Sequence, residues 1–95
     1  MKILPYYHSF TGKVPAVTLE LSEQLVEMAP KPMSKVLYAN SGSESNDTAV
    51  KVAWYYQNAL ECPNKKKIIS RLRGYHGVTI TTGSLTGMDY AHKGF

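Results

Sequence analysis

The chain has 95 residues, enough for at most one small domain, and 43% of them are hydrophobic, 11% aromatic and 19% charged, a composition typical of globular proteins. No apolar run approaches the roughly 20 residues of a membrane span. The net charge of +4 is spread along the chain, and its one dense basic run, Lys65 to Lys67, lacks the aromatic or arginine-rich surroundings of a nucleic-acid site. The single cysteine, Cys62, excludes an internal disulfide and indicates a reducing compartment. Because no secretory signal is visible after Met1, we expect a cytoplasmic protein.

Residues 3–14 are predicted to be irregular. They contain Pro5 and Gly12, which interrupt regular structure, and three aromatic residues, Tyr6, Tyr7 and Phe10. Such a segment has no core of its own, so we expect another part of the molecule to cover it.

An amphipathic helix is predicted from about Ala16 to Met28. Val17, Leu21, Leu25 and Met28 follow one another at spacings of four, four and three residues, which places them on one helix face. The Pro-Lys-Pro sequence that follows ends the helix.

A strand, a helix and a second strand are predicted next. Residues 35–39 and 66–72 are short apolar runs bounded by turn residues, and the helix between them runs from Ser43 to about Leu60. A further helix could begin within residues 77–85 despite their β-branched side chains. Strand, helix and strand form a βαβ unit, so the predicted fold class is α/β with parallel strands and a right-handed crossover.

The turn between the first strand and the second helix allows two interpretations. Ser41 and Glu44 have the spacing of a capping box, which would only satisfy the helix end. Alternatively, Ser41, Gly42 and Ser43 offer free N–H groups, hydroxyls and close approach at the positive end of the helix dipole, as a phosphate site does. This turn also follows a strand at the edge where open α/β sheets bind ligands. Glu44 and Asp47 are expected to serve the helix N-terminus by capping and through the dipole.

The sequence GYHG, residues 74–77, follows the second strand and should lie at the same edge of the sheet. Tyr75, between a glycine and a histidine, is poorly placed for core packing, and it is either a turn residue or a flat face for stacking. Together with the phosphate site, it suggests a ligand with one phosphate and one flat ring. His8, His76 and His92 show no metal-ligand spacing, so no metal site is predicted.

The two motifs NSGSESNDTAVKVA and RGYHGVTITTGSLTG, with the upstream LPYYHSFTGKVPAVTLELSEQL, resemble class III aminotransferases. These are fold type I enzymes that depend on pyridoxal phosphate, and they include the omega-amino-acid:pyruvate transaminases. The resemblance covers essentially all 95 residues. Ala39 stands where threonine is usual and Ser45 where alanine is common, and neither difference should remove phosphate binding.

The resemblance implies that residues 1–95 are part of a large domain with a three-layer α/β/α fold, in which residues 1–14 line a subunit interface or pocket. Ser41, Gly42 and Ser43 would hold the phosphate of pyridoxal 5'-phosphate, and Tyr75 would stack on its ring. Phe10 matches a residue of the substrate pocket, or else is an interface aromatic. An intact homodimer would move an amino group from an amine to a keto acid such as pyruvate, with no nucleic-acid or membrane partner.

The same resemblance implies that catalytic groups are missing from these 95 residues. The Schiff-base lysine and the carboxylate that pairs with the ring nitrogen would come beyond Phe95, and none of the nine lysines has a matching context. We therefore expect a fragment of a much longer enzyme that is inactive alone. The alternative is a noncatalytic module that binds a phosphate ligand or docks on a full-length homologue. The sequence does not identify the amine or the keto acid.

Overall fold

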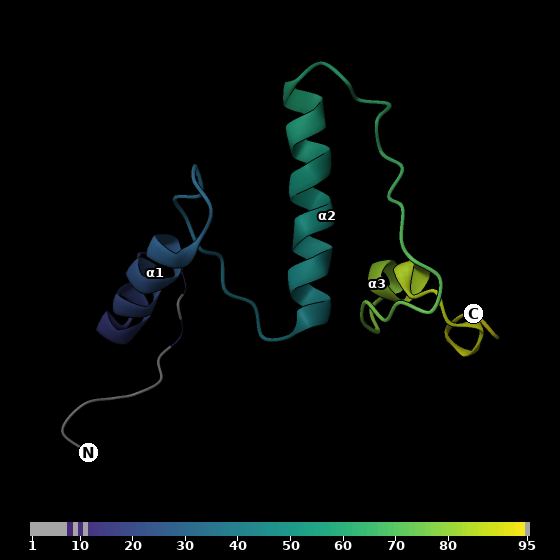
Figure 1. Cartoon of the computed structure of the whole chain (residues 1–95), viewed down its shortest axis with the longest axis horizontal. Helices are drawn as coiled ribbons and strands as arrows, with labels where there is room; N and C mark the ends of the chain where they lie inside the picture. The colour runs from purple at the N-terminus through teal and green to yellow at the C-terminus, as the bar shows by residue number, and fades with distance from the viewer. Residues whose placement is uncertain (1–7, 9, 11, 95) are drawn as a thin grey trace. The chain divides into compact units, whose positions relative to one another are not determined.

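The computed structural model describes residues 8, 10 and 12–94. The chain divides into two compact units, Met1–Leu37 and Tyr38–Phe95. The first contains α1, and the second contains α2, α3 and the short 3-10 helix η1 (Figure 1). No helix among the described residues is long and apolar enough to cross a membrane.

Helix α1 spans Ala16–Met28, as predicted. Pro15 precedes it in an extended conformation, and the Ala29 N–H donates to the carbonyl of Leu25 at its end. None of its residues is buried, so the apolar face that the sequence indicates is not covered within this unit.

Helix α2 spans Gly42–Ala59, starting one residue before the predicted Ser43. Ser41 is its N-cap, with an extended φ of −152°. At the other end, Glu61 takes a positive φ of 58°, which stops the helical path. Val50 is the one buried residue of this helix.

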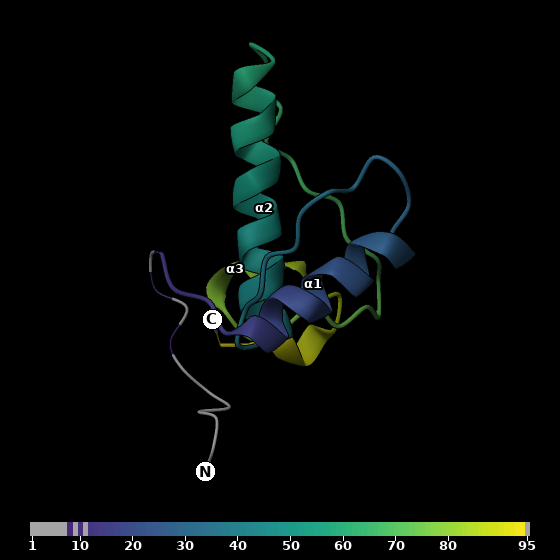
Figure 2. The same cartoon turned by 90° about the vertical axis from the view of Figure 1, so that its left-hand side faces the viewer.

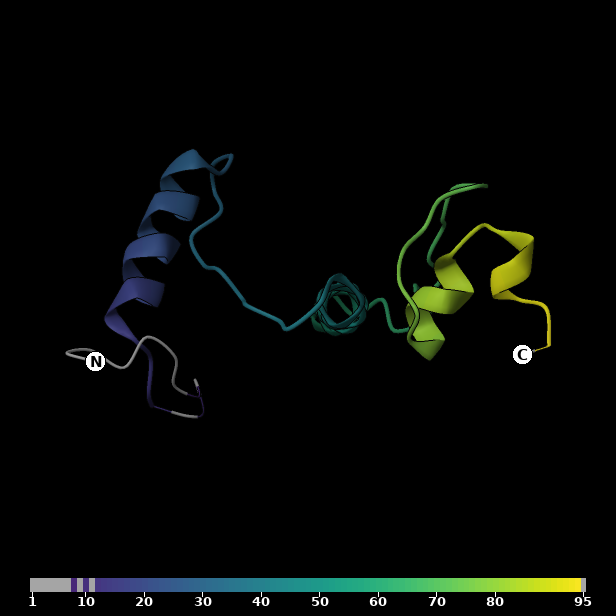
Figure 3. The same ribbon diagram turned by 90° about the horizontal axis from the view of Figure 1, so that it is seen from below.

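The chain then returns alongside α2, from its C-terminal end toward its N-terminal end, before α3 begins (Figures 1 and 2). Helix α3 spans Ile80–Leu85 and is the helix that the sequence suggested within residues 77–85. Thr79 and Thr82 form a capping box at its start. Figure 3, which looks along α2, shows α3 and η1 (Asp89–Ala91) on one side of that helix.

The predicted β-strands at 35–39 and 66–72 do not appear as strands in the described residues. Leu72 and Gly87 form an isolated parallel bridge, flanked by a hydrogen bond from the Gly87 N–H to the Gly74 carbonyl of 2.8 Å. Parallel strands are stable in sheets that are covered on both faces, and here Ile69 and Leu72 are almost fully exposed. The βαβ unit therefore stays a prediction.

Candidate functional site

The side chains of Ser41 and Glu44 both cap the start of α2, but Glu44 binds the residue before the N-cap, so only the Ser41 half of a capping box forms. The Ser41 hydroxyl accepts a hydrogen bond from the Glu44 N–H at 3.2 Å, and the Glu44 carboxylate accepts one from the Asn40 N–H at 3.0 Å. The capping roles expected of Ser41 and Glu44 are therefore both present, and they fix the direction in which α2 leaves the turn.

Gly42 and Ser43 occupy the first turn of α2, where N–H groups have no partner within the helix. Within the described residues, neither N–H has a hydrogen-bond acceptor. A Cβ added at Gly42 would meet no heavy atom within 4 Å. The turn therefore has open space and two available donors at the positive end of the helix, which fits a phosphate group.

The Ser43 side chain also joins α2 to the segment that follows Tyr75. Its hydroxyl oxygen accepts a hydrogen bond from the Val78 N–H at 3.0 Å, and its own O–H can still donate. Gly77 lies directly against it, with a φ of +133°, and a Cβ at this position would overlap the Ser43 hydroxyl. The second glycine of GYHG is needed for this close approach.

Two further side chains of α2 bind the same segment. The Asn46 amide donates to the His76 carbonyl at 2.8 Å, and the Asp47 carboxylate accepts from the Thr79 hydroxyl at 2.8 Å. Asp47 thus contacts a residue 32 positions away, where the sequence had suggested only a role at its own helix end. Ser43, Asn46 and Asp47 share one helix face by their spacing of three and four residues. That spacing was the signal available in the sequence, but it did not name the partner.

Tyr75 is 59% exposed, as a stacking surface would be. It lines a cavity of about 460 Å³ together with Ile80, Ser84 and Tyr90. Val78 and Gly77, which also line this cavity, are the residues that contact Ser43. The structure therefore brings the predicted ring-binding residue and the predicted phosphate-binding residue together through a four-residue stretch of backbone.

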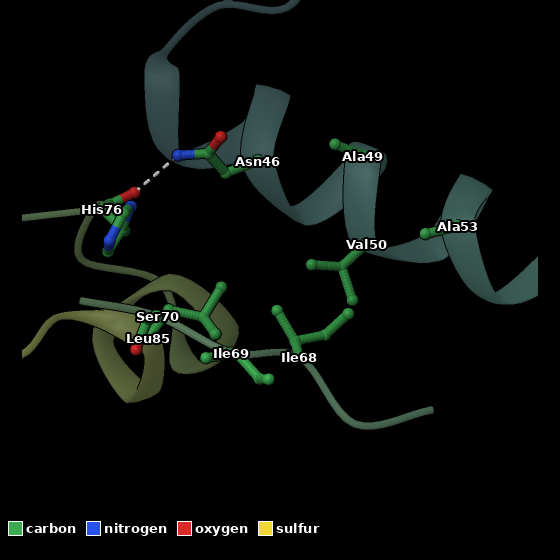
Figure 4. Close-up of a pocket in the computed structure, with 9 residues that line it drawn as sticks. All are labelled: Asn46, Ala49, Val50, Ala53, Ile68, Ile69, Ser70, His76 and Leu85. Atoms are coloured by element: carbon green, nitrogen blue, oxygen red, sulfur yellow. Dashed lines mark hydrogen bonds between the residues drawn. The ribbon is translucent and has the colours of Figure 1, made fainter. Parts of the chain in front are cut away.

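His76 turns away from this cavity into a second one of about 280 Å³, between α2 and residues 68–70 (Figure 4). Most of its lining is apolar: Ala49, Val50, Ala53, Ile68, Ile69 and Leu85. The His76 backbone N–H donates to the Thr86 hydroxyl at 3.0 Å, while its Nε2 is buried without a hydrogen-bond partner in the described structure. His76 therefore lines this mostly apolar cavity and not the one that Tyr75 lines.

Phe10 belongs to the unit Met1–Leu37. Its side chain is 76% exposed, and its carbonyl accepts a hydrogen bond from the Lys13 N–H at 3.1 Å. A place for it in a substrate pocket stays a prediction. Residues 8, 10 and 12–94 contain no cluster of three or more His, Cys, Asp or Glu side chains that could hold a metal ion.

The sequence profile of the class-III aminotransferases matches residues 6–95. The chain belongs to this family. Gamma aminobutyrate transaminase 1, mitochondrial, of Solanum lycopersicum is 48% identical over 96 residues, covering 100% of this chain and 19% of that protein. An uncharacterized aminotransferase of Sinorhizobium fredii, y4uB, is 52% identical over 89 residues, covering 94% of this chain and 19% of that protein.

Solved structures agree with this assignment. A transaminase described with L-ala has a TM-score of 0.90 and 57% identity, covering 100% of this class III chain and 22% of the other. The omega transaminase of Pseudomonas jessenii in complex with PMP has a TM-score of 0.88 and 56% identity. The match covers 97% of this chain and 20% of that one. The chain therefore spans about a fifth of the length of the relatives that it matches.

Proposed function

We propose that this class III chain supplies the phosphate-binding and ring-binding part of an intact, homodimeric aminotransferase that depends on pyridoxal phosphate. The intact enzyme would move an amino group from an amine or omega-amino acid to a keto acid such as pyruvate. The observation that carries the proposal is the hydrogen bond between Ser43 and Val78. It holds the open first turn of α2 against the segment that presents Tyr75.

Each residue of this arrangement has a distinct role in the proposal. The N–H groups of Gly42 and Ser43 and the Ser43 hydroxyl donate to phosphate oxygens, and Ser41 keeps the turn in place by capping α2. The exposed ring of Tyr75 stacks on the pyridine ring, and Phe10 lines the substrate pocket. When bound, pyridoxal phosphate supplies the electron sink that amino-group transfer requires.

The lysine that binds the cofactor covalently is proposed to lie outside these 95 residues. The lysines of the described segments are all exposed, whereas an activated lysine needs a desolvated or positively charged site that lowers its pKa. Lys51 lies on α2 eight positions after Ser43 and is exposed too. A cytoplasmic location remains part of the proposal, although several plant relatives carry the word mitochondrial in their names.

The phosphate assignment can be tested with two ligands that differ only in the phosphate. In the intact enzyme, Ser43→Ala removes one hydrogen bond to a charged group, worth about 1.5 to 3 kcal/mol. We expect its preference for pyridoxal phosphate over pyridoxal, measured by titration of the apoenzyme, to fall by about 10- to 100-fold. The ratio matters because Ser43→Ala also releases Val78, which affects both ligands.

Ser45→Ala is the matched control, since Ser45 is an exposed serine on the same turn of α2 and alanine is common there in the family. It should leave the ratio unchanged. If Ser43→Ala preserves the preference for pyridoxal phosphate, Ser43 does not hold the phosphate and the proposed site is wrong.

A further inference from the structure

Asn46 and Asp47 bind residues 75–79, here called the Tyr75 segment, close to its two ends. Neither residue lines the cavity that Tyr75 lines. Asn46 binds the carbonyl of His76, the residue directly after Tyr75 (Figure 4), and Asp47 binds the hydroxyl of Thr79. With the bond from Val78 to Ser43, three successive contacts fasten residues 76–79 to one face of α2.

The Asp47 contact is part of a directed chain of hydrogen bonds. The Thr79 hydroxyl has one proton and donates it to the Asp47 carboxylate. The Thr82 hydroxyl, 2.7 Å away, must therefore donate to the Thr79 oxygen. The Thr79 N–H donates to the Thr82 hydroxyl at 3.1 Å, and the Thr82 N–H donates back to Thr79 at 3.3 Å. Thr82 is fully buried, so the acceptor at Asp47 sets the direction of the hydrogen bonds at a hydroxyl that water does not reach.

We propose that Asn46 and Asp47 are positioning residues that set the place of the Tyr75 ring relative to the phosphate-binding turn. This inference rests on the proposed function. Their hydrogen bonds fix the peptide that follows Tyr75 and the start of α3, so the backbone that carries the ring has little freedom to move. The ring is then organised before the ligand arrives, which lowers the ordering cost of binding.

A purely structural role would predict a different pattern of ligand binding. If these bonds only stabilised the fold, their loss would weaken binding by the same factor whether or not residue 75 carried a ring. If they act through Tyr75, their effect must vanish once the ring is removed. A double-mutant cycle on ligand affinity separates the two cases.

The experiment combines Asn46→Asp with Tyr75→Ala in the intact enzyme. Aspartate has nearly the same shape as asparagine but has no N–H to donate to the His76 carbonyl. In the Tyr75 background, we expect Asn46→Asp to weaken the binding of pyridoxal, which has no phosphate for the new charge to repel, by about 2- to 10-fold. In the Tyr75→Ala background, the same change should have no effect. Asn58→Asp, an exposed position on the same helix, is the control and should leave the affinity for pyridoxal unchanged.

Thr79 provides a second, independent variant pair. Thr79→Val keeps the shape of the side chain but removes the donor to Asp47, and Thr79→Ser restores the hydroxyl. We expect the valine variant to weaken the binding of pyridoxal phosphate and pyridoxal only when Tyr75 is present, and the serine variant to bind like the parent. Equal effects of Asn46→Asp or Thr79→Val with and without the Tyr75 ring, or no effect with it, would overturn the positioning role. The phosphate assignment is judged separately, by the ligand preference of Ser43→Ala.

Discussion

Replacing Gly77 by alanine tests whether the Tyr75 segment truly packs against the start of α2. The added Cβ would overlap the Ser43 hydroxyl and lie 2.5 Å from Thr82 Oγ1 and 2.9 Å from Thr82 Cβ. The Ser43 and Thr82 hydroxyls each accept a hydrogen bond from a backbone N–H, so neither can move away without breaking that bond. The φ of +133° adds strain of its own, because side-chain-bearing residues rarely adopt it.

The expected cost is the sum of these two effects. A residue held in a disfavoured backbone region costs about 1 to 3 kcal/mol, and overpacking costs about 1 to 3 kcal/mol. A local destabilisation of at least about 2 kcal/mol corresponds to about 30-fold more frequent opening of the segment. Amide hydrogen exchange at Val78 measures this directly, since its N–H donates to the displaced Ser43 hydroxyl.

Gly83→Ala is the matched control for this measurement. Gly83 lies inside α3, and a Cβ there meets no heavy atom within 4 Å, so alanine should leave Val78 exchange unchanged or slow it by favouring the helix. Exchange at Val78 within threefold of the parent in Gly77→Ala would show that residues 76–79 do not pack on Ser43, and the site geometry would have to be abandoned.

Two further predictions concern the ring and the chain itself. Tyr75→Phe should largely preserve the affinity of the intact enzyme for pyridoxal phosphate, whereas Tyr75→Ala should lose about 0.5 to 1.5 kcal/mol plus the buried area; equal losses would assign the role to the hydroxyl. The 95-residue chain alone, incubated with pyridoxal phosphate and reduced with borohydride, should show slow, scattered labelling of its exposed lysines by mass spectrometry and no transamination of pyruvate. One stoichiometric lysine together with turnover would contradict the placement of the catalytic lysine outside this chain.

The helices could be predicted from the sequence because their signals are local. The apolar spacing of α1 and the prolines on either side give its bounds, Ala16–Met28. The capping-box spacing of Ser41 and Glu44 gives the start of α2 to within one residue. Residues 35–39 and 66–72 have the composition of strands, but a strand forms only through hydrogen bonds to a neighbour. The described residues provide just the isolated bridge between Leu72 and Gly87.

The candidate site was predictable in its parts and not in its connections. The Ser-Gly-Ser turn identifies Ser43 as a candidate phosphate-binding residue, and the GYHG motif identifies Tyr75 as a candidate stacking residue. The bonds from Asn46 to His76 and from Asp47 to Thr79 span 30 and 32 residues, and no spacing rule identifies partners at that distance. The need for Gly77 likewise emerges only once α2 and α3 are in contact.

The interior of the Tyr38–Phe95 unit has a thermal consequence. In the described part of the chain, its fully buried side chains are Thr82 and Thr86, and Val50 is its one buried hydrophobic residue. Exposing apolar surface raises the heat capacity and exposing polar surface lowers it, so opening this polar interior should change the heat capacity very little. The free energy that closes the Tyr75 segment should then fall almost linearly on warming, without the low-temperature maximum of an apolar core. On cooling, the free energy needed to open this part of the molecule should therefore rise steadily, even where hydrophobic contacts elsewhere weaken.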